Sequence, residues 1–151
     1  MATPNTIFIE LIGTLCVRER LAVAAFTPGH LVEVVAAGYQ KHSVAAGNAQ
    51  KVFATENIAD AGTIDRAYVA GETASAGYAQ SGELVYALVA AGATAIAVGA
   101  ALQSAGDGTL RVLSASAATT QAQRDGVVAY AAEAVDNSGG GSEVRIQVEV
   151  A

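Results

Sequence analysis

Val144-Arg145-Ile146-Gln147-Val148-Glu149-Val150 carries apolar and polar residues in alternation. Successive side chains of a β-strand point to opposite faces of a sheet, so this period of two is typical of a strand with one buried face and one wet face. A helix would need a period near 3.6 residues. The stretch therefore predicts a strand of a barrel or a sandwich.

Shorter stretches of the same kind recur upstream, each bounded by Gly, Pro, Asp or Asn. Residues 105–108 read Ala-Gly-Asp-Gly between two apolar runs, and such a pair supplies the positive φ angles of a tight hairpin. Long helical periodicity is absent. The pattern predicts an all-β fold, either a small β-barrel or a sandwich. The expected strands are 31–35, 51–55, 84–89, 100–104, 109–113, 127–133 and 144–150.

The chain also shows a faint internal repeat. Residues 28–33 resemble residues 98–103, and residues 38–41 resemble residues 108–111, both at an offset of 70. Two related β-units folded into one barrel would explain the repeat. Chance similarity in a chain rich in Ala and Gly explains it equally well.

The composition favours a protein that assembles with other subunits over one that functions as a monomer. Hydrophobic residues make up 52% of 151 residues, but much of this is alanine, which has little apolar area to bury. A small domain of this kind gains stability by burying surface against other subunits. The net charge of −6 argues against nucleic-acid binding, which needs clustered Lys and Arg. Residues 1–51 nevertheless carry four basic and three acidic groups, a local charge of +1.

The first 27 residues differ from the rest, since an apolar, β-prone run precedes a break at Thr27-Pro28-Gly29. We therefore expect an N-terminal arm over residues 1–27 and a β-barrel domain over residues 28–151. An extended arm of this kind can add a strand to a neighbour. The alternative is that the segment is the first strand of the same barrel. The residues expected to contact other subunits or a larger partner are Ile7, Phe8, Ile9, Arg18 and Arg20.

No segment of the sequence favours export or membrane insertion. Residues 1–6 lack the basic region of a secretory signal, and Glu10 interrupts the apolar stretch that follows. Residues 84–106 carry no charge, but they consist mainly of Ala, Gly, Val and Thr and are broken by Gly92 and Gly99. We expect strands there rather than a transmembrane helix.

No arrangement of residues predicts catalysis or metal binding. His30 and His42 are the only histidines, and no cluster has metal-ligand spacing. Cys16, the only cysteine, lies in an apolar run and is expected to be a buried, inert thiol. A nucleophilic Gly-x-Ser-x-Gly motif and a phosphate-binding loop are both missing from the sequence. We expect no catalytic residue, no cofactor and no metal. The acids available for a catalytic pair lie in turn-like contexts: Asp60, Asp65 and Asp107.

Two stretches, residues 91–111 and residues 127–137, resemble small head proteins of tailed bacteriophages. The first contains Ala95-Ile96-Ala97-Val98-Gly99, and the strand over 144–150 follows the second. The resemblance covers the chain from Gly29 onward and is to decoration (cement) proteins of the β-tulip or related β-barrel type.

The resemblance implies a structural, non-enzymatic virion protein whose residues 28–151 form a small β-barrel or β-tulip-like domain. Such proteins bind the capsid exterior as homotrimers and brace the joints between major capsid subunits. The implied partners are further copies of the chain and the major capsid protein, with no nucleic acid and no membrane. The implied location is the outside of the virion, after synthesis in the host cytoplasm. Two other classes remain: another phage component (fibre, tail or head-completion protein), and a trimeric β-fold enzyme such as a nucleotide hydrolase.

Overall fold

The computed structural model describes residues 3–113 and 125–151, and these residues form an all-β fold. The elements found there are strands β1 to β11 and one 3-10 helix, η1 (Ile58–Asp60). The predicted fold class is therefore confirmed. Residues 1 and 2 of the predicted arm and residues 114–124 of the predicted body lie outside the described residues.

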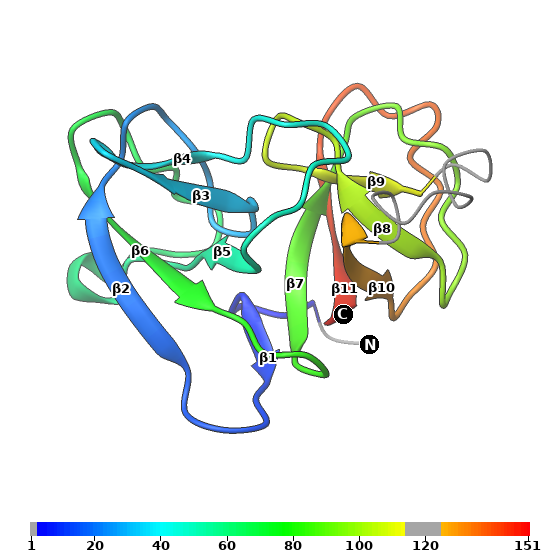
Figure 1. The fold of residues 1–151 in the computed structure, drawn as a ribbon, viewed down its shortest axis with the longest axis horizontal. Helices are drawn as coiled ribbons and strands as arrows, with labels where there is room; N and C mark the ends of the chain where they lie inside the picture. Colours follow the sequence, from blue (N-terminus) through cyan, green and yellow to red (C-terminus); the bar gives the residue numbers. More distant parts are fainter. Residues whose placement is uncertain (1–2, 114–124) are drawn as a thin grey trace.

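A closed five-stranded barrel forms the second half of the chain, on the right in Figure 1. Its strands pair in the order β7-β11-β10-β8-β9, and a parallel pairing of Val89 with Leu110 joins β9 back to β7. Strand β1 (Phe8–Glu10) extends this sheet by pairing with β7. The barrel strands are β7 (Leu84–Val89), β8 (Ala101–Ser104), β9 (Leu110–Val112), β10 (Val127–Ala131) and β11 (Val144–Val150).

The strands of the first half lie on the left in Figure 1. Strands β2, β6 and β5 form one antiparallel sheet, and β3 and β4 form a hairpin. Single bridges between Leu31 and Phe53 and between Ala22 and Tyr39 connect the hairpin to the two edges of the sheet, which completes a ring. The strands are β2 (Cys16–Leu21), β3 (Val32–Val35), β4 (Gly38–Lys41), β5 (Val52–Ala54) and β6 (Thr73–Tyr78).

The two rings have the same topology. In each, the first strand pairs with the fifth, the fifth with the fourth, the second with the third, and the first meets the third in parallel. The faint sequence repeat therefore corresponds to a structural repeat of a first unit (16–78) and a second unit (84–150). Each unit forms its own ring, so the repeat is not two halves of one barrel.

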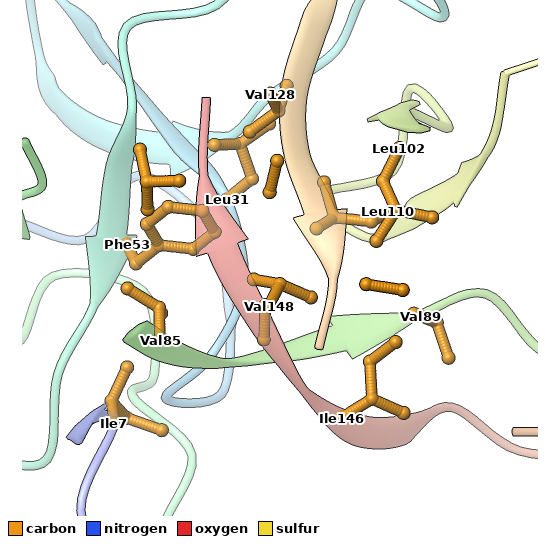
Figure 2. Packing of buried hydrophobic residues seen from close by; sticks show 14 of the residues in the cluster. Ile7, Leu31, Phe53, Val85, Val89, Leu102, Leu110, Val128, Ile146 and Val148 are labelled. Carbon is orange, nitrogen blue, oxygen red and sulfur yellow. The ribbon is translucent and has the colours of Figure 1, made fainter. Parts of the chain in front are cut away.

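The two units share part of their apolar core. Most of the larger cluster comes from the second unit, but Leu31 and Phe53 from the first unit and Ile7 from the N-terminal segment belong to it. Figure 2 shows Leu31 and Phe53 beside β11, close to Val148. Because these side chains are fully buried, separating the units would expose a large apolar area to water. A second cluster, rich in Ala and Tyr, fills the first unit.

The predicted hairpin at residues 105–108 joins β8 to β9. Gly106 and Gly108 have φ angles of 92° and 82°, which side chains other than glycine's adopt at a cost. The Asp107 carboxylate accepts hydrogen bonds from the Thr109 N–H and hydroxyl at 3.0 and 2.5 Å. The loop thus fixes the register in which Ser104 faces Leu110.

Gly38 permits the closest approach between β4 and β2. Its φ is 145°, and a Cβ atom at this position would lie 2.0 Å from the Leu21 carbonyl oxygen. Only a residue without a side chain fits there, because backbone cannot yield as a flexible side chain does. This contact leads into the Ala22–Tyr39 bridge that completes the first ring.

Replacing Gly38 with alanine should therefore destabilise the protein more than a matched glycine substitution does. Gly71 also has positive φ, 85°, but its Cβ would meet no atom within 4 Å. We expect Gly71→Ala to cost about 1 kcal/mol from backbone strain, and Gly38→Ala to cost a further ~1–3 kcal/mol from overpacking. Denaturant titration measures both losses. Equal losses of stability in the two variants would show that the close contact between Gly38 and Leu21 does not require glycine.

Candidate interaction surface

The start of the N-terminal segment is bound to its own chain. Ile7 is fully buried in the larger core cluster. Its N–H donates to Glu56 Oε2 at 3.3 Å, and its carbonyl accepts from the Tyr86 N–H at 2.7 Å. In this single chain the predicted arm thus begins with a strand of the second unit's sheet. Exchange of this strand between copies stays a prediction.

A buried carboxylate holds the following loop in place. Glu83 is only 1% exposed, and its two oxygens accept from the Gln80 N–H at 2.9 Å and the Ile12 N–H at 3.3 Å. The loop between β1 and β2 is thereby tied to the turn between β6 and β7. This contact fixes Leu11 and Ile12 on the surface, where 45% and 67% of each residue is exposed.

Phe8 and Ile9, the other predicted apolar contacts, are half-buried. The Phe8 ring lies against the backbone of β6, where a Cβ at Gly77 would be 2.4 Å from the ring. Gly77 therefore lets the N-terminal segment lie flat across the sheet of the first unit. Phe8 therefore forms part of the surface, and its contact with Gly77 holds it there in this chain.

Strand β2 is exposed at all six of its residues. The guanidinium carbons of Arg18 and Arg20, the two predicted charge contacts, lie 5.1 Å from the Tyr78 ring centre and 6.0 Å from the Tyr39 ring centre. Both cations are therefore held over aromatic rings, an attractive geometry. Cys16 is exposed at the start of the strand, so the prediction of a buried thiol is wrong. Its apolar neighbours face a surface groove instead of the core.

That groove is an apolar hollow of about 340 Å³. Its walls are formed by the N-terminal segment, β2, Ser75 of β6 and the segment around η1. Ile58, on η1, is 81% exposed, and Val17 is 47% exposed. Adjacent large apolar side chains on a surface are typical of a contact site. The lining residues are Thr6, Phe8, Leu11, Leu15, Val17, Glu19, Thr55, Glu56, Ile58, Ala59 and Ser75.

One polar cluster has the composition of a nucleophilic triad. His42 Nδ1 lies 2.7 Å from Ser104 Oγ, and His42 Nε2 lies 4.0 Å from Glu33 Oε2. Ser104 has no exposed surface, and its Oγ already accepts from the Gly106 N–H at 3.1 Å. A substrate cannot reach this hydroxyl, so the cluster connects β3, β4 and β8 rather than forming a nucleophile.

Glu33 anchors the exposed side of this cluster. Gln40 and Ser43 each donate a hydrogen bond to Glu33 Oε1 at 2.7 Å. Burial raises the pKa of Glu33, but the hydrogen bonds from Gln40 and Ser43 and the nearby His42 outweigh it, so the pKa lies below its usual value. The carboxylate therefore stays charged at neutral pH.

His30 lies at the junction of the two units and is 1% exposed. Its Nδ1 is within hydrogen-bonding distance of the Thr27 N–H and carbonyl, at 3.0 and 2.9 Å. Its Nε2 lies 3.1 Å from Glu143 Oε2, near enough for an ion pair but not aligned as a hydrogen bond. Burial lowers the pKa of His30 and Lys41 adds to this, while Thr27 and Glu143 oppose it. The neutral ring is favoured.

Within residues 3–113 and 125–151, no group of three or more His, Cys, Asp or Glu side chains is placed to hold a metal ion. No helix in the described part of the chain is long and apolar enough to cross a membrane. The uncharged segment 84–106 contains β7 and β8. No protein-family model matches the chain, and no curated protein was found to be its relative.

Acidification should weaken the junction through His30. Its pKa is below the ordinary 6.5 in the folded state, so the unfolded chain binds the proton more readily. The contribution of neutral His30 to the free energy of unfolding is therefore fully present above about pH 7, and it is lost as the pH drops through about 6. Thermal unfolding of the wild type and of His30→Asn, which retains a polar group near Thr27, measures the effect.

The expected difference is a flatter dependence of the melting temperature on pH in His30→Asn between about pH 7 and about pH 5. Glu33 also has a lowered pKa, but its ordinary value is 4.5, so its contribution is lost at lower pH. Identical slopes for the two proteins in the upper window would contradict a role for His30.

Proposed function

We propose that this protein is a structural virion protein that binds the outside of a phage capsid as a homotrimer and stabilises the joints between major capsid subunits. The groove beside β2 carries the proposal, because it offers a rigid, exposed apolar face. The resemblance of residues 91–111 and 127–137 to decoration proteins supports the same function. The partners would be two further copies of the chain and the major capsid protein.

The apolar residues of this face suit an assembly contact. Ile58 and Ile12 are 81% and 67% exposed, and covering either one could contribute about 1.5–3 kcal/mol before ordering costs are subtracted. A trimer presents each such contact three times, so modest individual contacts sum to firm attachment on a symmetric shell. A binding mode of this kind requires no catalytic or metal-binding residues at the surface.

The distribution of charge supports a defined orientation. Residues 1–51 carry a net charge of +1 and residues 52–151 carry a net charge of −7, which together give the total of −6. The acidic part would keep decorated particles apart in solution. The less acidic part, which includes β2, would meet the partner.

Two substitutions of matched exposure test this proposal. Ile12, which follows the groove-lining Leu11, and Val98, in the loop before β8, are both 67% exposed. We expect Ile12→Glu to abolish trimer formation or binding to purified heads, because burying an unpaired carboxylate in an apolar contact is costly. Val98→Glu should retain both. Sedimentation gives the oligomeric state, and electron microscopy of heads mixed with protein gives the occupancy.

The wild-type protein is the reference in both measurements. A wild type that sediments as a monomer at micromolar concentration and leaves heads undecorated would refute the proposal. Loss of binding in Val98→Glu but not in Ile12→Glu would show that the contact lies on the second unit instead.

A further inference from the structure

The repeated topology allows the first strands of the two units, β2 and β7, to be compared edge by edge. Strand β7 is covered along its entire outer edge. Strand β1 pairs antiparallel with its start, where Phe8 faces Val85, and the Gly29 carbonyl accepts from the Leu88 N–H at 3.0 Å. The parallel contact with Leu110 covers the end of the strand.

The corresponding edge of β2 is covered only at its end. Gly38 approaches the Leu21 carbonyl, and the Val23 N–H donates to the Tyr39 carbonyl at 2.8 Å. Over residues 16–20, β6 is the only strand that pairs with β2 among the described residues. The position that β1 occupies on β7 is therefore open on β2.

Backbone donors point into this open position. The Ala22 N–H bonds toward β6, to the Glu72 carbonyl, whereas the Val23 N–H bonds away from it, to Tyr39. Successive N–H groups of a strand alternate between its two edges, so those of Val17 and Glu19 face the open side. Unpaired donors in a row form a template for an added strand.

The side chains of β2 define the chemistry of such a strand. Arg18 and Arg20 are two residues apart and share one face, and neither takes part in the ion pairs found among the described residues. A strand paired there would place its alternate side chains beside these two cations. Carboxylates at these positions would complement them. The opposite face, at Val17 and Glu19, opens on the groove, whose other walls include the apolar residues Phe8 and Leu11.

We infer that the open edge of β2 binds an extended partner segment that alternates acidic and apolar residues, paired antiparallel as β1 is paired on β7. Its carboxylates would meet Arg18 and Arg20, and its apolar side chains would cover Val17 and the groove. The inference deepens the proposed function, on which it rests for its biological partner, by naming the chemistry of the segment that the surface takes.

A peptide titration with the full chain tests the inference without any capsid. The probe is a fluorescein-labelled, acetylated peptide that alternates valine and glutamate over about eight residues, the length of a typical strand. Fluorescence anisotropy should show saturable binding. Hydrogen exchange should slow at the amides of Val17 and Glu19. A peptide with lysine in place of glutamate should bind at least tenfold more weakly, because it opposes two arginines.

Matched variants separate charge from strand pairing. Arg18→Glu/Arg20→Glu should reverse the preference between the two peptides, whereas Arg111→Glu, an exposed change on β9, should leave binding unchanged. N-methylation of alternate peptide amides should weaken binding at least tenfold without any change in the protein. Equal binding of both peptides, no binding at millimolar concentration, or binding without slower exchange in β2 would each overturn the inference.

The same variants distinguish this inference from the proposed function. Peptide binding by a protein that never decorates heads would refute the proposed function and leave the inference standing. Unchanged decoration by Arg18→Glu/Arg20→Glu would refute the inference and leave the proposed function standing.

Discussion

The second edge of β7 is the constraint on which the rest of the structure depends. Its first edge pairs with β11 over six residues, an ordinary antiparallel contact. Its second edge is shared by three short partners in succession: β1, the backbone at Gly29 and the start of β9. One strand thus closes the barrel, holds the N-terminal segment and binds the first unit. Buried backbone donors without partners are costly, so all three contacts are needed to satisfy this edge.

The strands that could be predicted from the sequence are those with large buried apolar side chains, whereas β6, which buries alanine and glycine, was not among the expected strands. The bounds of β7 and β11 agree with the prediction, because their apolar residues alternate or run together between clear breaks. Strand β2 carries the sequence Cys-Val-Arg-Glu-Arg-Leu, whose two faces are both exposed, so it gave no signal of burial. The exposure of both faces of β2 also explains why the prediction of a buried Cys16 thiol was wrong. Apolar neighbours in sequence indicate a core only when the strand has a covered face.

The clusters at the unit junction could not be found from the sequence. His42 and Ser104 are 62 residues apart, and each has a common local explanation. The groove residues Leu15 and Ile58 are likewise distant in sequence, and single apolar residues on a surface are normal.

The repeat at an offset of 70 was the one signal that pointed beyond local structure. It was weak because the first unit fills its interior with Ala and Tyr, and the second unit with Val, Leu and Ile. A ring topology tolerates either filling if the total volume is kept.

The exposure of Cys16 has a practical consequence. It is the only cysteine in the chain, and it lies at the start of β2, next to Val17 on the wall of the groove. A maleimide dye or a nitroxide spin label would therefore attach at one position without prior mutagenesis. That position adjoins the surface where a partner is expected to bind, so the emission of a dye or the mobility of a spin label would report occupancy of this surface directly.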